Sequence, residues 1–318
     1  MVLTRRASSI ARLRRKIQRA VCKSTLILCE CAKTLAIPAN MGYNRACCVK
    51  EVTPMLLHEF DPAETAIFNP SMVFDPIAGM PKVAVSCFSF VTFDRMLALF
   101  PDAVQITELK CASQRFPVYK VRYKDVELAL YMSGVGAPLC VGSQEEIYAL
   151  GAECLVLFGT CGVLERNIAD CAVILPTSAM RDEGTSYHYA PPGDEIPVNI
   201  HHEELFLNLM AELHLPCVTG KTWTTDSMYR ETREKTARRK DAGCVCVDME
   251  CASVAAAAQF RGKEALHFFY AADNLDAAEW DERSLSNFAN LEEKDRIALI
   301  ALEAAQRITL TKASPKEA

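Results

Sequence analysis

The sequence lacks any apolar run of about 18 residues, which is the length that a helix needs to cross a lipid bilayer. It also lacks internal repeats, and no Gly/Ser-rich linker divides the chain after residue 55. These absences exclude a membrane-spanning protein, a repeat protein and a string of linked domains. Half of the residues are hydrophobic, which is ample for one large core, so we expect a single domain over residues 55–318.

The sequence patterns of metal sites and disulfide frameworks are absent as well. The cysteines form no Cys-x-x-Cys pair, and the six histidines show no spacing that is typical of metal ligands. Several of the fifteen cysteines stand in apolar runs, where a free thiol behaves as a small hydrophobic side chain. We therefore expect free thiols in a reducing cytoplasm, with no metal and no cofactor.

Charge is unevenly distributed along the chain. Residues 1–50 contain eleven Lys and Arg against one acidic residue, Glu30. The net charge of the whole chain is −5, so the remainder carries about −15, which argues against nucleic acid as a partner of the folded part. We interpret residues 1–54 as a basic extension, disordered or dispensable. A transit peptide and a basic segment at a membrane surface are the alternatives.

Apolar runs and turn residues alternate along the rest of the chain and predict an α/β fold. The runs that predict strands cover 82–87, 117–122, 126–132, 154–158, 171–175, 244–247 and 265–270. The segments that predict helices cover 92–100, 138–150, 202–214, 230–240, 250–260 and 292–310. Pro138 in the first turn of one predicted helix and Gly151 just past its end fit the usual positions of these residues.

Three acidic residues lie at the ends of two predicted strands. One strand ends at Asp248 and Glu250, a helix follows, and the next strand ends before Asp273. In a strand–helix–strand unit both strand ends fall on the same edge of the sheet, where α/β folds bind ligands. We therefore expect these carboxylates to converge. The alternative is that Asp248 and Glu250 only cap the following helix, a role that does not explain Asp273.

The motif Val-Asp-Met-Glu-Cys-Ala at 247–252, followed by Ala-Asp-Asn at 272–274, resembles the signature of the nucleoside phosphorylase family. That family includes uridine phosphorylase, hexameric purine nucleoside phosphorylase and the adenosylhomocysteine/methylthioadenosine nucleosidases. The resemblance covers residues 55–290. It implies a three-layer fold with a mixed, curved central sheet flanked by helices, and a homo-oligomer, either a dimer or a hexamer.

The same motif implies roles for its members. In the family, the Met-Glu pair holds the ribose, and these roles fall on Met249 and Glu250, with Asp248 beside them. The acid that protonates the base in purine-acting members corresponds to Asp273. Clustering of Asp273 with Asp248 and Glu250 should raise the pKa of Asp273, which favours its action as an acid near neutral pH.

Further segments resemble the phosphate-binding and base-binding parts of the family. Gly159 and Thr160 belong to a glycine-flanked turn, and Gly136 to a second glycine-containing loop, which together resemble the paired ribose-phosphate loops. Met228 takes the place of an aromatic residue that stacks on the base. Arg233 matches an arginine that reads uracil, although an exposed helix charge is an equal interpretation.

The sequence does not decide between purine and pyrimidine substrates. Arg181 opens a polar loop that is closer to the uridine-acting members, whereas Asp273 favours purines.

Two departures from the family leave the nucleophile open. The Gly-Asp-Pro-x-Arg loop that binds phosphate is absent, and Leu157 replaces a second arginine. Arg95 and a neighbouring subunit's Arg115 are possible replacements. Three hypotheses follow: a phosphorylase that uses phosphate, a nucleosidase that uses water, and a nucleoside-binding protein without turnover.

Overall fold

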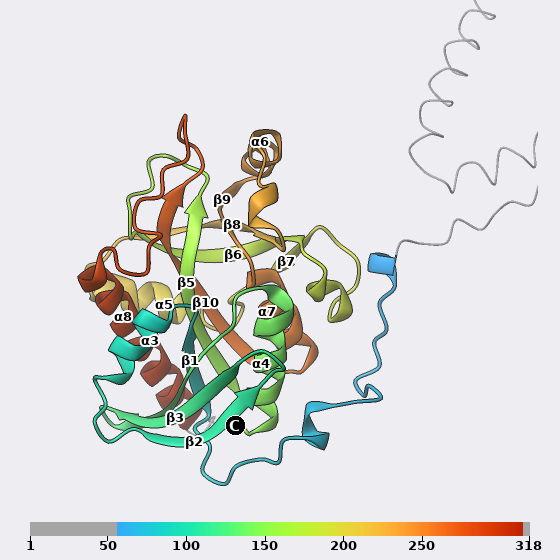
Figure 1. Ribbon diagram of the computed structural model, residues 1–318, viewed down its shortest axis with the longest axis vertical. Coiled ribbons are helices and arrows are strands. Elements are labelled where there is room, and N and C mark those ends of the chain that lie inside the picture. The colour runs from blue at the N-terminus through green and yellow to red at the C-terminus, as the bar shows by residue number, and fades with distance from the viewer. Residues whose placement is uncertain (1–55, 314–318) are drawn as a thin grey trace, which may run out of the picture. The chain divides into compact units, whose positions relative to one another are not determined.

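The computed structural model describes residues 56–313 of the chain (Figure 1). The predicted basic extension at 1–54 lies outside the described residues. The strands are β1 (Val83–Cys87), β2 (Val104–Lys110), β3 (Arg115–Tyr123), β4 (Val126–Met132), β5 (Cys154–Val163), β6 (Val173–Asp182), β7 (Glu195–Pro197), β8 (Cys217–Thr225), β9 (Cys244–Asp248) and β10 (Glu264–Asn274).

Six α-helices and four short 3-10 helices occur in the same described part of the chain. The α-helices are α3 (Phe90–Leu97), α4 (Ala137–Ala149), α5 (Glu203–Glu212), α6 (Arg233–Asp241), α7 (Cys251–Phe260) and α8 (Leu291–Ala313). The 3-10 helices are η1 (Leu56–His58), η2 (Pro70–Met72), η3 (Thr185–His188) and η4 (Met228–Arg230). The helix predicted from Pro138 begins and ends as expected, because α4 carries Pro138 in its first turn and Gly151 follows it with φ 122°.

The sheet curls until it closes on itself. Its strand order is β10-β6-β8-β9-β5-β1-β4-β3-β2, and β5 also pairs with β10. These pairings join β5, β10, β6, β8 and β9 into a closed ring of five strands. Strands β1, β4, β3 and β2 extend from β5 as an open wing that ends in the β2–β3 hairpin, and β7 pairs with β6. The predicted mixed, curved sheet is therefore confirmed, since both parallel and antiparallel pairs occur.

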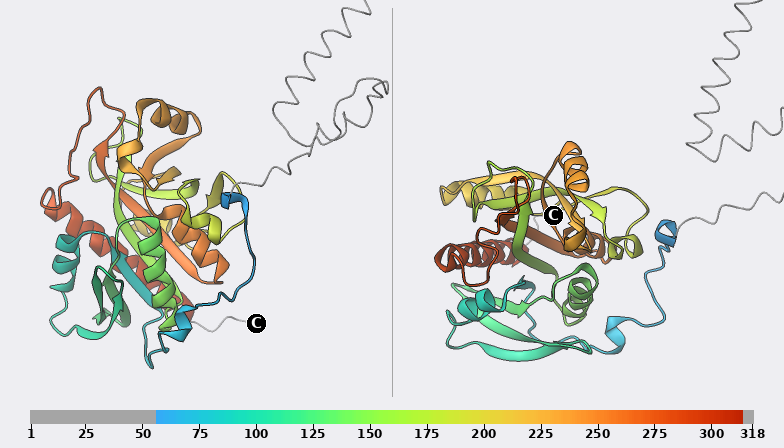
Figure 2. Two further views of the ribbon diagram at one scale, coloured as in Figure 1. Left: turned by 45° about the vertical axis from the view of Figure 1, so that its right-hand side comes forward. Right: turned by 45° about the horizontal axis from the view of Figure 1, so that its top comes forward.

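Helices cover the sheet on both sides. Helices α3, α5 and α8 pack on one face through a core that includes Phe206, Phe158 and Phe268. Helix α4 covers the other face of the open wing, and α7 lies beside it (Figures 1 and 2). Eight of the ten residues of α7 are buried, which explains why this helix is almost entirely alanine and other small residues. The predicted three-layer arrangement is confirmed.

The strand–helix–strand argument made from the sequence is wrong in one respect. Strand β10 runs parallel to β5, but β9 runs antiparallel to β5. The two strands on either side of α7 therefore do not share a direction. Their acidic residues still line one cavity, because β9 pairs with the last residues of β5, Gly162 with Val247 and Val163 with Cys246. The curl of the sheet, rather than parallel pairing, brings Asp248 and Asp273 to the same cavity.

The predicted turn at 159–162 is also wrong. Strand β5 continues through these residues to Val163, and its neighbour β10 stays in register with Gly159, Thr160 and Cys161. The backbone amides of this stretch therefore belong to the sheet and do not form a phosphate-binding turn. A glycine pair suggested a turn, but here glycine makes room for neighbouring side chains.

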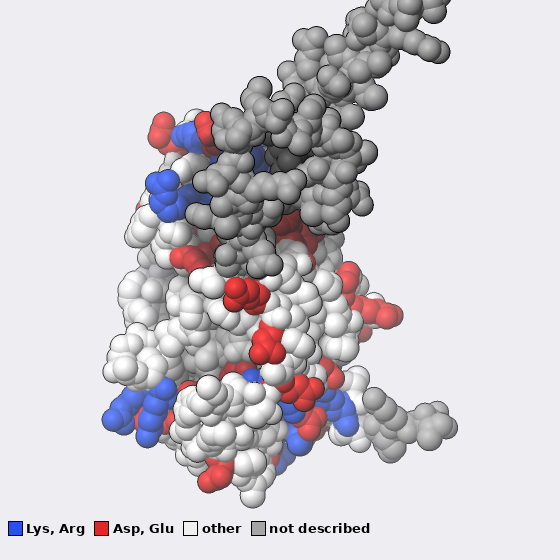
Figure 3. Space-filling model, turned by 90° about the vertical axis from the view of Figure 1, so that its right-hand side faces the viewer, with Lys and Arg blue, Asp and Glu red and all other residues white. Residues whose placement is uncertain are grey.

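The segment before β1 runs down the side of the molecule that Figure 3 shows. The charged side chains in the middle of this face are mainly Asp and Glu, and Lys and Arg gather above and below them. The segment carries several large exposed apolar side chains, Ile67, Phe68, Met72 and Val73. Within residues 56–313, none of the helices combines the length and apolar character that crossing a membrane requires.

Candidate active site

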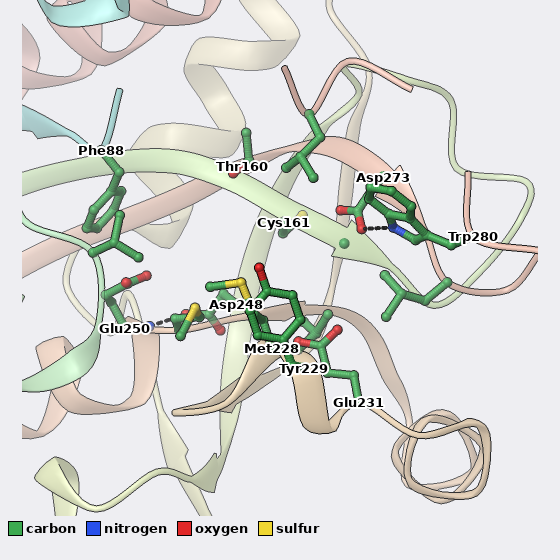
Figure 4. Close-up of a pocket in the computed structure, with 16 residues that line it drawn as sticks. Phe88, Thr160, Cys161, Met228, Tyr229, Glu231, Asp248, Glu250, Asp273 and Trp280 are labelled. Atoms are coloured by element: carbon green, nitrogen blue, oxygen red, sulfur yellow. Dashed lines mark hydrogen bonds between the residues drawn. The ribbon is translucent and has the colours of Figure 1, made fainter. Parts of the chain in front are cut away.

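A cavity of about 620 Å³ opens where β5, β9 and β10 end. It lies between these strands, η4 and the segment after β10 (Figure 4). Its lining consists of Phe88, Val135, Thr160, Cys161, Gly162, Met228, Tyr229, Glu231, Val247, Asp248, Met249, Glu250, Asp273, Leu275, Trp280 and Leu285. The volume is in the range of small-molecule sites. Glu250 and Phe88 stand at one end, and Asp273 and Trp280 stand at the other.

Asp248 organises the first end of the cavity. Its Oδ1 accepts hydrogen bonds from the hydroxyls of Thr222 and Thr224, each at 2.9 Å. Its Oδ2 accepts from the backbone N–H groups of Glu250 at 2.8 Å and Cys251 at 2.6 Å. These four bonds occupy the carboxylate and cap the start of α7. The capping interpretation is therefore right for Asp248, whose role is to fix the backbone of Glu250.

Glu250 itself does not cap the helix. Its Oε1 accepts the backbone N–H of Gly136 at 2.5 Å, and its side chain is buried at the cavity wall. Gly136 has φ 99°, a conformation that favours glycine, so this residue type allows the loop before α4 to present its N–H. Burial, and then the charge of Asp248, raises the pKa of Glu250 to about 8.

The opposite end of the cavity holds two more acids. The Oδ2 of Asp273 accepts the indole N–H of Trp280 at 2.9 Å (Figure 4). Burial raises the pKa of Asp273 above its usual range, although the bond from Trp280 opposes this. The expected direction of this pKa shift is right, but its main cause is burial and not the charges of Asp248 and Glu250. Burial and the charge of Asp273 raise the pKa of Glu231 to about 7.

The cavity is acidic. Four carboxyl groups line it, and none of its lining residues within the described chain is Lys, Arg or His. An anion such as phosphate therefore meets unfavourable charge whenever these acids are ionised. Because the pKa of Glu231 is raised to about 7 and that of Glu250 to about 8, both groups are mainly protonated below pH 7, which reduces this repulsion there.

Between the two ends, several predicted residues line the cavity wall. Thr160 on β5, Met249 after β9 and Met228 on η4 all line it. Gly159 precedes Thr160 but faces the ring of Phe88, which lies 2.7 Å from where a Cβ would be. Gly159 therefore allows Phe88 to reach the cavity rather than binding a ligand itself.

The two arginines that were predicted to bind substrate, Arg181 and Arg233, do not line the cavity. Arg181 is buried, donating to the Ser186 hydroxyl at 2.8 Å and to the Pro191 carbonyl at 2.7 Å. These bonds hold the loop after β6 and leave the arginine outside the cavity lining. Arg233 donates to the carbonyl of Ala278, on the segment that also carries Trp280. It too lies outside the lining.

The two arginines considered as replacements for the family's phosphate ligands are not among the lining residues of this chain's cavity, and the suggestion that a neighbouring subunit offers its Arg115 stays a prediction. Arg95 on α3 binds both carboxylate oxygens of Asp295 on α8. Arg115 at the start of β3 pairs with Glu108 at 3.1 Å. Leu157 is fully buried in the core against the sheet.

Sequence reasoning missed two polar residues of the cavity. Glu231 follows Met228 by three positions, and Trp280 lies in a stretch without periodic pattern. Neither position carries a motif. The one available signal was the scarcity of tryptophan, because the chain has only two. Trp223 is fully buried, and Trp280 is the one that lines the cavity.

Comparison with known proteins identifies the class of protein that this fold and cavity define. A sequence model of the phosphorylase superfamily matches residues 90–311, which is most of the chain. The chain belongs to this superfamily.

Individual relatives fall within the same class. The chain is 27% identical over 223 residues to a guanosine phosphorylase of Halorubrum lacusprofundi, a match that covers 68% of this chain and 86% of the relative. It is 26% identical over 159 residues to a DeoD-type purine nucleoside phosphorylase of Bacillus cereus, covering 49% of this chain and 68% of the relative.

Two solved structures share the fold at 18% sequence identity. One is the purine nucleoside phosphorylase of Toxoplasma gondii in complex with immucillin-H, with a TM-score of 0.63 over 73% of this chain and 93% of that one. The other is the uridine phosphorylase of Vibrio fischeri, with a TM-score of 0.59 over 72% of this chain and 93% of that one.

Proposed function

We propose that this protein is a nucleoside phosphorylase, which breaks the N-glycosidic bond of a nucleoside with phosphate to give ribose 1-phosphate and a free base. The observation that carries the proposal is the placement of Glu250 and Asp273 at opposite ends of one cavity (Figure 4). One acid can hold the sugar while the other serves the base. The related guanosine and purine nucleoside phosphorylases support the same reaction class.

The proposed reaction assigns a task to each end of the cavity. Glu250 accepts hydrogen bonds from the sugar hydroxyls, with its backbone fixed by Asp248 and its carboxyl by Gly136. As the C1′–N bond breaks, its electron pair goes to the base, and Asp273 supplies a proton there. The N–H of Trp280 occupies Oδ2, which leaves Oδ1 of Asp273 as the proton donor. A phosphate oxygen forms the new bond to C1′ on the opposite face of the sugar.

We infer that the base is a purine. Asp273 suits a leaving group that gains a proton, and the phosphorylases of Halorubrum lacusprofundi and Bacillus cereus are named for guanosine and purine nucleosides. The flat rings of Trp280 and Phe88 and the apolar side chain of Met228 fit an aromatic base and a sugar between the two acids.

The test is a panel of purine and pyrimidine nucleosides, assayed with and without phosphate, with products separated by chromatography. We expect base release to rise with added phosphate and to yield ribose 1-phosphate. Hydrolysis is the alternative that the acidic cavity and Leu157 favour. Release that is independent of phosphate and yields free ribose would replace the phosphorylase by a nucleosidase. Binding without release of any base would leave the nucleoside-binding alternative.

We further infer that the protein acts as a homo-oligomer in a reducing compartment such as the cytoplasm. The exposed apolar side chains of Ile67, Phe68, Met72 and Val73 support an interface on the segment before β1. The ten cysteines in the described part of the chain are all free thiols, which fits reducing conditions.

A further inference from the structure

A cluster of possible metal ligands lies at the other end of the sheet from the cavity. It consists of Cys154 at the start of β5, Glu264 at the start of β10, and His202, the residue before α5. Cys154 and Glu264 are direct partners across the two strands. Thr160, on the cavity wall, is six residues further along β5, which corresponds to about 20 Å of strand. This cluster therefore does not belong to the site described above.

Two of the possible ligand atoms, the Cys154 sulfur and a Glu264 oxygen, lie close to the third, the Nε2 nitrogen of His202. His202 Nε2 lies 3.5 Å from Cys154 Sγ and 2.9 Å from Glu264 Oε2. A neutral imidazole nitrogen either donates a proton or offers a lone pair, so Nε2 cannot bond well to the thiol and to the carboxylate at the same time. A metal ion between the three atoms would serve all of them.

Two of the three distances between the ligand atoms can be compared with those around a tetrahedral ion, and the third, from Cys154 Sγ to the Glu264 carboxylate, is within 4.8 Å. Usual Zn–S and Zn–N bond lengths place the sulfur and nitrogen about 3.5 Å apart, as they are here, and place nitrogen and oxygen about 3.3 Å apart. The second distance requires a small outward movement of the Glu264 carboxylate. Its side chain is 29% exposed, so it has room to move, whereas Cys154 and His202 are buried.

We propose that Cys154, His202 and Glu264 form a binding site for a thiophilic divalent cation such as Zn²⁺, with one position open to water. Cys154 and His202 are buried, and Glu264 is the partner of Cys154 on the neighbouring strand, so the fold holds the three ligands together. Binding of the metal to Cys154 releases the thiol proton to the solvent.

A catalytic role for the thiol does not fit this cluster. Burial raises the pKa of Cys154 far above its usual range, so without a metal the sulfur stays protonated and unreactive. In a nucleophile–histidine–carboxylate arrangement the two ring nitrogens contact different partners, whereas here Nε2 faces both.

Lys312 on α8 competes with the metal. Its Nζ lies 2.7 Å from Oε2 of Glu264, so its positive charge and its hold on the carboxylate both disfavour a cation. The site therefore allows a test in two directions. Removal of a ligand must weaken binding, and removal of Lys312 must strengthen it.

The experiment titrates the full-length protein, after treatment with a chelator, with Zn²⁺ by calorimetry and with Co²⁺ by absorption spectroscopy. We expect wild type to bind one more ion than Cys154→Ala and to show a thiolate-to-cobalt charge-transfer band that Cys154→Ala and His202→Gln lack. Each of these variants should weaken the Kd of this site at least about 100-fold. Zn²⁺ should raise the Tm of wild type more than that of either variant.

Two further variants complete the design. Lys312→Met should tighten the Kd about tenfold, because it removes a competing charge. Cys217→Ala removes a half-buried cysteine outside the cluster and should bind as wild type does. Cysteines elsewhere are the same in wild type and His202→Gln, so they cannot produce the difference between them. Equal stoichiometry and Kd in wild type, Cys154→Ala and His202→Gln would overturn the proposal.

Discussion

At the residue scale, the pKa of Glu250 decides whether its carboxyl group is charged when it binds the sugar. With this pKa raised to about 8, the side chain is mainly protonated at pH 6 and ionised at pH 9. A carboxylate forms a charge-assisted hydrogen bond that an amide cannot match, whereas a neutral acid differs little from an amide.

We therefore expect Glu250→Gln to lower kcat/KM about 100-fold at pH 9, which corresponds to about 2–3 kcal/mol, and to lower it less at pH 6. Gln keeps an oxygen that can accept the N–H of Gly136, so the fold should persist. The measurement is a pH profile of kcat/KM for wild type and variant. Activity near that of wild type at pH 9 would rule out the role of Glu250 at the sugar.

Asp273 allows a second prediction at this scale. Asp273→Asn retains an acceptor for Trp280 but has no acidic proton to give to the base. We expect cleavage of purine nucleosides to fall by about 10²–10⁴-fold, while cleavage of a nitrophenyl riboside, whose leaving group needs no proton, changes little. Equal losses on both substrates would show that the substitution damages the site and not the proton transfer.

At the element scale, strand β5 passes closely behind the acids. A Cβ on Gly162 would lie 2.3 Å from Cδ1 of Leu275, 3.1 Å from Oδ1 of Asp273 and 3.1 Å from Cγ1 of Val247. A methyl group at this position must therefore push aside the end of the Leu275 side chain and press on the carboxyl group of Asp273, the proposed proton donor.

We expect Gly162→Ala to lower kcat at least about tenfold, because small displacements of a catalytic group are costly. Gly142→Ala is the matched control, since its methyl group meets no atom within 4 Å and Ala favours the helix. The comparison measures kcat and Tm for both variants. A Gly162→Ala enzyme with the kcat of wild type would show that β10 adjusts without moving Asp273.

The elements also show what could be predicted from the sequence. Asp248, Glu250 and Asp273 stand beside strands that apolar runs identify, so a local pattern was enough to place them. Trp280 and Glu231 reach the cavity only because the sheet curls and the segment after β10 returns over it, which no local pattern reveals. The assignment of Arg181 to substrate failed because its partners, the carbonyls of the loop at 190–191, become neighbours only in the folded chain.

At the scale of the whole molecule, the charge of the cavity should govern phosphate binding. Glu231 and Glu250 have pKa values raised to about 7 and 8, so both lose their protons between pH 6 and pH 9. Each ionisation adds a negative charge to the cavity in which we propose that phosphate reacts.

We therefore expect the KM for phosphate to rise at least about tenfold over this range at low ionic strength, and to rise less in high salt. Glu231→Gln should remove the part of the rise near pH 7. The measurement is the phosphate KM as a function of pH for both enzymes. A KM that stays constant with pH in wild type would separate phosphate binding from the charge of these acids.

A prediction about the basic extension belongs to the same scale. The described residues, 56–313, supply the four acids of the cavity and the large hydrophobic cores on both faces of the sheet. We expect a chain that begins at Met55 to fold with an unchanged Tm and to keep its kcat/KM. Thermal melting and the nucleoside assay test this directly. Aggregation or loss of activity in the shortened chain would show that residues 1–54 are part of the domain.

The closed ring of strands has a consequence for how the protein acquires its activity. The pairing of β5 with β10 joins residues about 110 positions apart in the chain, and such distant contacts form late and slowly because long loops must close first. Until that ring closes, Asp273 has no fixed relation to Glu250. The refolding protein should thus regain its helical signal well before it regains catalysis. The rate at which turnover recovers therefore measures the last step of folding.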